Sequence, residues 1–319
     1  MQRRHFLGLS LAAGFAASGL SGCSSRGPLA FGVHHWIGYE PLYLARDFGW
    51  LPASVELYSG ESAEDSMTGL LSGDLQGAAL TLDETIRLVA RGLDLVAVAV
   101  ADVSAGADVL MVRQDLSGLS DLQGRRVAVE TGSVSEIMFL RILEVAELDR
   151  ENVVLVDLPV SRHPEAWQAG QIDASVCYEP VASVLARNGG VRLFDSRQLP
   201  ETIFDLLVVT RETARQNPGA VRDLVTAHFA GLRHLVRGIH DAVYRVANRQ
   251  GVTPADVRQA LATVTLPDLA ANQRYLSESG RVATTAGSLS RLMVGAGMIA
   301  SPPALKTLCD PGFLPRSVS

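Results

Sequence analysis

The fold is indicated by a local sequence pattern that occurs twice, in residues 71–84 (LSGDLQGAALTLDE) and again in residues 169–180 (AGQIDASVCYEP). Each copy predicts a helix end closed by glycine, a tight turn, a short strand and an acidic residue at the carboxyl end of that strand. Glycine suits the helix end because the left-handed position after a helix penalises any Cβ atom. We therefore expect two similar lobes of strands and helices, which form a hinged clamp with a ligand in the cleft.

Alternating strands and helices extend outward from both copies. Leu29–Val33 predicts a first strand, and the continuous apolar run Leu95–Ala101 predicts a strand covered on both faces. Phe204–Thr210 is apolar and β-branched, and predicts a strand that returns to the first lobe. We expect the first lobe to comprise residues 29–113 and 204–319, and the second lobe to comprise residues 114–203.

The chain beyond Arg211 has a helical pattern. It predicts three helices, Pro218–Arg237, Ile239–Gln250 and Pro254–Val264, with weaker helical segments near the end. This part therefore adds a helical layer to the first lobe.

The composition is that of a folded protein with an acidic surface. The 319 residues are 47% hydrophobic and 19% charged, which excludes a disordered chain. Glycine has no period and heptads are absent, so collagen and coiled-coil folds are excluded as well. The formal charge is −6 and no run of basic residues is present, so we do not expect nucleic acid as a partner. We expect a monomer.

The N-terminus has the features of an export signal. Arg3 and Arg4 precede the apolar run Phe6–Leu20, whose 15 residues fit a signal-peptide core but are too few to cross a bilayer. The run ends in residues 20–23 (LSGC), which resemble the lipobox of bacterial lipoproteins. The resemblance implies a signal peptide over residues 1–22, a lipidated Cys23 and a tether over residues 23–28. An ordinary secretory signal with an incidental cysteine is the alternative.

We therefore expect an exported protein, anchored through lipid to a bacterial membrane and facing the periplasm or the cell exterior. Residues 3–7 (RRHFL) also resemble a twin-arginine motif, which implies export after folding. Two arginines occur in other export signals as well, so the Sec route stays open. The sequence also leaves open whether the inner or the outer membrane holds the anchor.

Four stretches resemble, in the same order, the substrate-binding lipoproteins of ABC importers for nitrate, sulfonates, taurine and thiamine-pyrimidine precursors. They are residues 36–46 (WIGYEPLYLAR), 122–129 (LQGRRVAV), 169–174 (AGQIDA) and 178–180 (YEP). The resemblance covers about residues 29–210. It implies an α/β, two-lobed type II periplasmic-binding-protein fold, in which each lobe is a mainly parallel sheet flanked by helices. It also implies a small-molecule solute as ligand and the transmembrane subunits of an ABC permease as partner.

Ligands of open α/β sheets bind at the carboxyl ends of the strands, so the loops there supply the candidate site. Trp36 and Tyr39 follow the first strand and would wall a ligand, and Gly38 would let the backbone approach it. Thr131, Gly132 and Ser133 open a helix, whose free N–H groups favour an anion. The candidate ligand-binding residues are Trp36, Gly38, Tyr39, Ser59, Gly60, Asp83, Glu84, Thr131, Gly132, Ser133, Tyr178, Glu179 and Asp205.

The acidic candidates point to a positive group on the ligand. Carboxylates near strand ends would suit an amine, an amidinium or an aminopyrimidine, and Glu179 is the residue we expect to contact it. The alternative for Glu179 is a structural carboxylate stabilised by the helix dipole, and the alternative for Ser133 is plain capping completed by Glu136. Asp102 and Asp108 flank the predicted lobe junction and would brace the hinge instead. We expect a nitrogen-bearing solute such as an aminosulfonate or a pyrimidine precursor, with a plain oxyanion as the alternative.

No motif for a cofactor, a metal site or an enzyme is present. The chain has no nucleophile elbow, phosphate-binding loop or reactive-cysteine motif, although an enzyme on the same fold related to pyrimidine synthesis is a less favoured alternative. His34 and His35 are adjacent on a strand end and would point opposite ways, so we expect no metal there. Cys177 and Cys309 form a disulfide only if the fold brings them together, which the sequence does not show.

Overall fold

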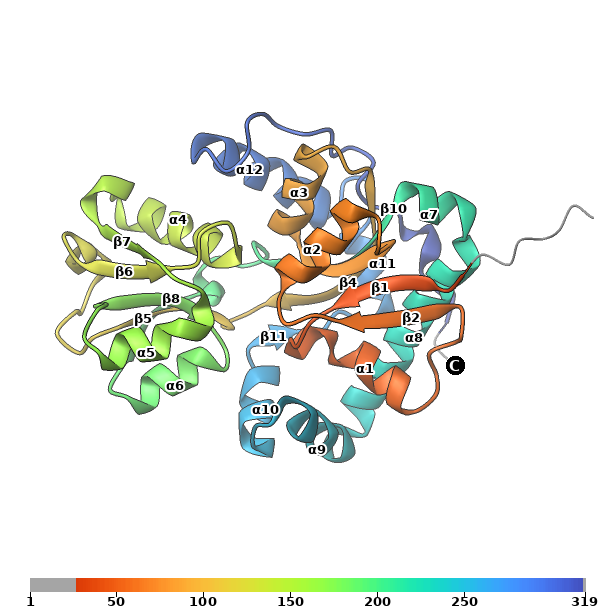
Figure 1. The fold of residues 1–319 in the computed structure, drawn as a ribbon, viewed down its shortest axis with the longest axis horizontal. Helices are drawn as coiled ribbons and strands as arrows, with labels where there is room; N and C mark the ends of the chain where they lie inside the picture. The colour runs from red at the N-terminus through yellow and green to blue at the C-terminus, as the bar shows by residue number, and fades with distance from the viewer. Residues whose placement is uncertain (1–26, 318–319) are drawn as a thin grey trace, which may run out of the picture.

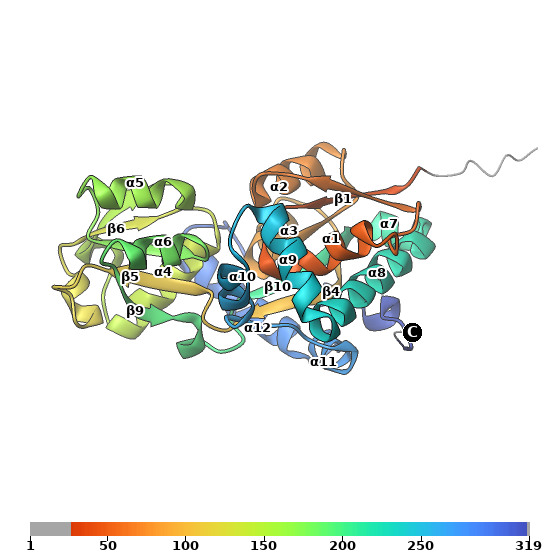
Figure 2. The same cartoon turned by 90° about the horizontal axis from the view of Figure 1, so that it is seen from below.

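Two β-sheets, each with helices on both faces, build the molecule (Figures 1 and 2). The computed structural model describes residues 27–317, so the expected signal peptide and Cys23 lie outside the described residues. The first sheet has the order β11-β4-β10-β3-β1-β2 and the second has the order β7-β6-β8-β5-β9. Within the described residues, no helix is long and apolar enough to span a membrane.

The first lobe contains the first sheet and most of the helices. Its strands are β1 (Leu29–Val33), β2 (Val55–Ser59), β3 (Gly77–Thr81), β4 (Leu95–Ser104), β10 (Phe204–Thr210) and β11 (Val264–Thr265). Its helices are α1 (Glu40–Asp47), α2 (Ala63–Ser72), α3 (Leu82–Ala90), α7 (Arg211–Gln216), α8 (Pro218–Arg237), α9 (Ile239–Gln250), α10 (Pro254–Leu261), α11 (Leu269–Tyr275) and α12 (Arg281–Gly295). A short 3-10 helix, η1 (Ile37–Tyr39), precedes α1.

The second lobe is smaller. Its strands are β5 (Asp108–Val112), β6 (Arg126–Val129), β7 (Val154–Asp157), β8 (Ala174–Tyr178) and β9 (Val191–Asp195). Its helices are α4 (Val134–Ala146), α5 (His163–Gln168) and α6 (Val181–Arg187). Both sheets are mixed rather than mainly parallel as expected. The first has the parallel pair β1–β2 and the antiparallel pair β3–β10, and the second has the parallel pair β6–β7 and the antiparallel pair β5–β8.

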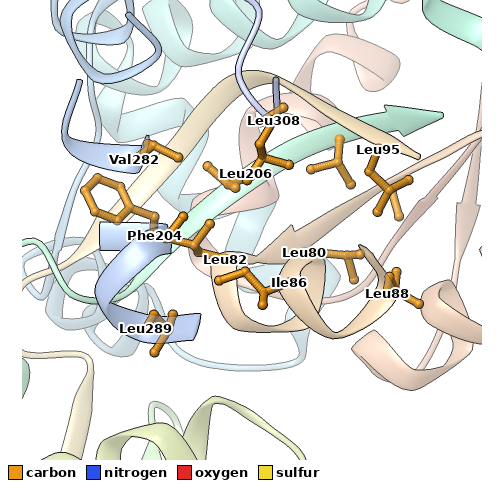
Figure 3. Close-up of a cluster of buried hydrophobic side chains, with 14 of the residues drawn as sticks. Leu80, Leu82, Ile86, Leu88, Leu95, Phe204, Leu206, Val282, Leu289 and Leu308 are labelled. Atoms are coloured by element: carbon orange, nitrogen blue, oxygen red, sulfur yellow. The ribbon is translucent and has the colours of Figure 1, made fainter. Parts of the chain in front are cut away.

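Apolar side chains cover both faces of the first sheet. On one face, Leu80 and Leu206 of the sheet pack against Ile86 of α3 and Leu289 of α12 (Figure 3). On the other face, strand residues such as Val98 pack against α1 and α8. Burial on both faces explains why β4 and β10 are continuous apolar runs rather than alternating ones.

The chain crosses between the lobes twice, after β4 and after β9. Side chains of one crossing bind the other, because Ser104 Oγ lies 2.7 Å from Ser196 Oγ and the Gly106 amide donates to Ser196 Oγ at 2.7 Å. Arg192 adds a hydrogen bond to the Gly106 carbonyl at 2.7 Å. Gly106 has φ +114°, a backbone conformation that disfavours any other residue. The two crossings therefore form one tied hinge.

The structure differs from the expected lobe boundary by one strand. We expected the first lobe to extend to residue 113, but β5 pairs with β8 and β9 in the second sheet. The crossing therefore occurs between Ser104 and Asp108. Both β4 and β5 are apolar runs, and hydrophobic pattern alone does not say which sheet a strand joins. The strand Phe204–Thr210, expected to return to the first lobe, does so as β10.

Candidate ligand-binding site

A cavity of about 340 Å³ lies between the lobes, at the carboxyl ends of the strands. From the first lobe and its crossing it is lined by His34, His35, Trp36, Glu61, Ser62, Ala63, Glu64, Met67, Thr81, Glu84, Arg87, Ile203 and Asp205. From the second lobe it is lined by Asp108, Glu130, Thr131, Gly132, Ser133, Val134 and Tyr178. Movement of one lobe relative to the other would therefore change the shape of this cavity.

Two aromatic rings, one from each lobe, meet at the cavity. The Trp36 ring stands edge-on to the Tyr178 ring, with centroids 6.0 Å apart. The Trp36 indole nitrogen donates a hydrogen bond to Asp102 Oδ2 at 3.0 Å, which fixes the ring on the first lobe. We expected Asp102 and Asp108 to brace the hinge, but Asp102 lies inside β4 with its side chain fully buried, and Asp108 begins β5 and lines the cavity.

Gly38 leaves room for the Asp102 carboxylate that binds Trp36, and it does not bring the backbone close to the cavity. A Cβ atom at Gly38 would lie 1.5 Å from Asp102 Oδ2, so only glycine leaves room for the carboxylate. Tyr39 is also buried behind the cavity, and its hydroxyl donates to Asp205. Both candidates therefore lie beneath the cavity wall, outside its lining.

Six acidic residues line the cavity, and three of them, Glu84, Asp108 and Asp205, are buried. Burial raises the pKa of Glu84 to about 7 and that of Asp108 to about 6. Burial, together with the neighbouring Asp102, raises the pKa of Asp205 well above its usual value. Asp83 lies one residue before Glu84 but is buried outside the lining, and burial raises its pKa as well. These carboxyls therefore hold protons more tightly than carboxyls in water.

Arg87 gives the cavity a cationic side that the sequence analysis did not include. Its Nε atom is buried and, within the described residues, has no hydrogen-bond partner. Its guanidinium contacts the Met67 sulfur at 3.4 Å, and no carboxylate of the described chain lies within ion-pair distance. A Cβ atom at Gly132 would lie 2.9 Å from Arg87 Nη1, so a loop of the second lobe covers this arginine. Arg87 follows Glu84 by three positions on α3, and this helical spacing was the signal available in the sequence.

The start of α4 lies beside Arg87. Ser133 caps the helix by accepting from the Ser135 amide at 3.1 Å, and Glu136 accepts from the Gly132 amide at 2.7 Å. Among the residues that the structure describes, the amides of Ser133 and Val134 have no acceptor. Ser133 therefore caps the helix, but Glu136 bonds the Gly132 amide rather than the Ser133 amide, so the expected capping box is not formed and the Ser133 amide stays open. Thr131 differs, because its amide and hydroxyl both donate to Asp157.

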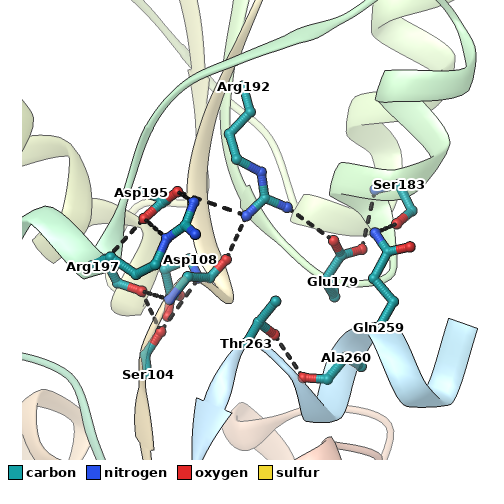
Figure 4. A network of polar contacts seen from close by, with 12 residues as sticks. Ser104, Asp108, Glu179, Ser183, Arg192, Asp195, Arg197, Gln259, Ala260 and Thr263 are labelled. Carbon is teal, nitrogen blue, oxygen red and sulfur yellow. Dashed lines mark hydrogen bonds and ion pairs between the residues drawn. The ribbon is translucent and has the colours of Figure 1, made fainter.

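The remaining candidates lie away from this cavity. Ser59 and Gly60 line a different, more open cavity beside β2. Glu179 lines a second interlobe cavity of about 200 Å³, on the far side of Trp36. It accepts from Arg192 Nη2 at 3.2 Å and from the Ser183 amide at 3.1 Å (Figure 4). Glu179 therefore binds the same arginine that holds the hinge.

In the described part of the chain, the histidines form no metal site and the cysteines form no disulfide. His34 and His35 both line the main cavity, but the described residues contain no cluster of ligands able to hold a metal ion. Cys177 and Cys309 are both free thiols, one in β8 and the other beside β4. Burial raises the pKa of each thiol to about 12, so neither is a ready nucleophile.

Two mixed sheets joined by two tied crossings, with a cavity at the strand ends, define the periplasmic binding protein fold. The solved structure of the periplasmic aliphatic sulphonate binding protein SsuA from Escherichia coli superposes with a TM-score of 0.78. The two are 19% identical, over 90% of this chain and 92% of that one. The model of the NMT1-like family matches residues 24–248, and the chain belongs to this family.

Two curated relatives from Escherichia coli (strain K12) are similar in sequence. The taurine-binding periplasmic protein is 22% identical over 76% of this chain and 75% of its own length. A protein named for the binding of aliphatic sulfonates is 32% identical over 46% of this chain, which spans about half of that relative (47%). An enzyme also has this fold, since the desulfurization enzyme DSZB superposes with a TM-score of 0.67 at 18% identity, over 91% of this chain and 98% of that one.

Proposed function

We propose that the chain is an extracytoplasmic solute-binding protein that captures a small polar solute between its lobes and delivers it to an ABC import permease. The observation that supports this most is the cavity itself, which both lobes line and which lies at the hinge crossings. A solute that contacts both lobes stabilises the closed arrangement, because it binds that arrangement with more contacts than the open one. Surfaces on the two lobes then meet the permease in the geometry of the closed state.

The solute class follows from the charges that face the cavity. Glu84, Asp108 and Asp205 would accept from a nitrogen, whereas a bare anion would give these buried carboxyl groups no partner. Arg87 and the amides at the start of α4 would bind an acidic group on the same solute. The relatives named for taurine and for aliphatic sulfonates agree with an aminosulfonate.

The ligand-binding residues that we propose are those candidates that line the main cavity, together with the arginine. They are Trp36, Glu84, Arg87, Thr131, Gly132, Ser133, Tyr178 and Asp205. Trp36 and Tyr178 would enclose the short carbon chain, because their rings meet across the cleft. A plain oxyanion would use Arg87 and the amides alone, and leave the carboxyl groups without a partner.

We also propose that the protein is exported and anchored at a membrane. We propose that Cys23 is lipidated and holds the protein at a bacterial membrane, within reach of its permease. Cys23→Ala would then release the protein from the detergent phase in extracts of expressing cells. Unchanged partitioning of the variant would contradict the lipid anchor and favour an ordinary secretory signal.

Calorimetric titration of the purified protein tests the solute class. We expect taurine to bind more tightly than ethanesulfonate, which lacks the nitrogen, and more tightly than nitrate, bicarbonate or an aminopyrimidine. Equal binding of ethanesulfonate and taurine would favour the oxyanion alternative. Release of sulfite from either sulfonate at catalytic turnover would instead identify an enzyme. A ligand present at 100 times its Kd should stabilise the fold by about 2.7 kcal/mol, so thermal shifts provide a first screen.

A further inference from the structure

Two buried carboxyl groups lie side by side beneath the main cavity. Asp102 of β4 and Asp205 of β10 are cross-strand partners, and their residues are 0% and 4% exposed. The Oδ1 atom of Asp102 is buried and has no hydrogen-bond donor in the described part of the chain. Asp205 also lines the cavity, so one member of the pair faces the site and the other lies behind it.

The groups around the pair supply neutral donors and further acids. Trp36 donates to Asp102 Oδ2 at 3.0 Å, and the Tyr39 hydroxyl donates to Asp205. Among titratable groups, Glu84 of α3 and Asp108 of β5 act on the pair, and both are acidic. The neighbouring strands bring no further charge, since Thr81 of β3 pairs with Asp205 and β11 consists of Val264 and Thr265.

No cation of the described chain forms an ion pair with either carboxyl group. Two carboxylates in contact and out of water repel each other strongly, so such a pair keeps one proton between its oxygens. The unpartnered Oδ1 atom of Asp102 is the oxygen that this shared proton would satisfy. The pair is therefore incomplete without either a proton or another positive group.

We propose that the Asp102–Asp205 pair holds one proton in the empty protein, and that a protonated amine of the solute replaces this proton at Asp205. The displaced proton leaves to solvent, so the charge beneath the site is the same before and after binding. Burial raises the pKa of Asp102 to about 7, in agreement with a proton held near neutral pH. An alkylamine stays protonated near neutral pH and supplies the positive charge that replaces the proton, whereas a sulfonate without an amine supplies none. The exchange rests on the proposed function, although the shared proton does not.

The affinity for an aminosulfonate should then depend on pH. Binding releases a proton wherever the empty pair holds one, so affinity rises as the pH rises through that range. The increase approaches tenfold per pH unit when one full proton is released. Asp205 is the contact residue in this exchange, and Asp102 is a positioning residue that acts through Asp205.

The shared proton is tested first without any ligand. The pH dependence of the unfolding free energy reports the protons that folding takes up. We expect Asp102→Asn and Asp205→Asn each to reduce that uptake near pH 7 by about one proton, and the double variant to reduce it by no more than either single variant. Asp74→Asn, at an exposed turn, is the control and should leave the uptake unchanged. Additive losses, or no loss in either single variant, would overturn the shared proton.

Calorimetry with taurine then tests the exchange. Titrations in two buffers of different ionisation enthalpy give the number of protons released. We expect nearly one proton near pH 6.5 in the wild-type protein and none in Asp102→Asn. Ethanesulfonate should release none in either protein. Binding of taurine without proton release, or with equal release in the two proteins, would overturn the exchange. If neither probe binds, the proposed solute class fails and the exchange with it, while the ligand-free experiment still decides whether the proton is shared.

Discussion

Gly38→Ala should disrupt the buried support of the cavity wall. The new Cβ atom would lie 1.5 Å from Asp102 Oδ2 and 2.3 Å from Asp102 Cγ, well inside van der Waals contact. The carboxyl group must move away, which breaks its hydrogen bond to Trp36. Loss of that bond costs about 1–3 kcal/mol and the overpacking costs about 1–3 kcal/mol more. We therefore expect the free energy of unfolding to fall by about 2–6 kcal/mol.

Urea denaturation followed by circular dichroism measures this loss. Gly219→Ala is the matched control, because Gly219 lies in α8 with open space around it, and alanine there should be neutral or stabilise by up to about 1 kcal/mol. A double-mutant cycle identifies the clash, since Gly38→Ala should cost less when Asp102 is already alanine. An unchanged stability of Gly38→Ala would refute the reasoning. So would an equal cost in both backgrounds.

Three further predictions concern charge. Arg87→Gln should weaken taurine binding at least tenfold, about 1.4 kcal/mol. The control Arg91→Gln, at the exposed end of the same helix, should leave the affinity unchanged. Equal calorimetric affinities of Arg87→Gln and the wild-type protein would exclude Arg87 from the site. Glu179→Gln should lower the free energy of unfolding by about 1–3 kcal/mol, because Glu179 binds Arg192 outside the main cavity. The taurine affinity should change less than twofold. A tenfold loss of affinity with unchanged stability would instead place Glu179 in the binding site. His228 is fully buried and burial lowers its pKa to about 4, so only the unfolded chain takes up its proton between pH 6.5 and 4. Stability should therefore fall by about 3 kcal/mol over that range, and His228→Phe should remove this part of the acid sensitivity in urea titrations at several pH values.

Local pattern was sufficient for many elements of the fold. The strand Phe204–Thr210 and the helices α8 and α9 have the predicted bounds, because proline opens α8 and glycine follows α9. β4 runs to Ser104 and not to Ala101, since pairing with β10 and β11 carries it past an aspartate that is a poor strand residue. The strand β9 was not predicted, because its residues VRLFD gain their strand conformation from pairing with β5.

The site was harder to predict, because it depends on contacts between distant segments. Trp36, Tyr178 and Ser133 line the cavity, as expected of residues at strand ends and helix starts. Gly38 was expected to bring the backbone close to a ligand, and this was wrong, because the group packed against it is the buried carboxyl of Asp102. Glu179 follows the end of β8 much as Asp83 and Glu84 follow the end of β3, and only the fold shows its pairing with Arg192.

A crystal structure of the protein with taurine bound tests the central claim most directly. We predict the molecule in the main cavity, with its sulfonate against Arg87 and the Ser133 amide and its nitrogen against Asp205. The lobes should contact it from both sides, with Trp36 and Tyr178 around the carbon chain. Taurine found only in the second interlobe cavity beside Glu179, or only on the outer surface, would contradict the account.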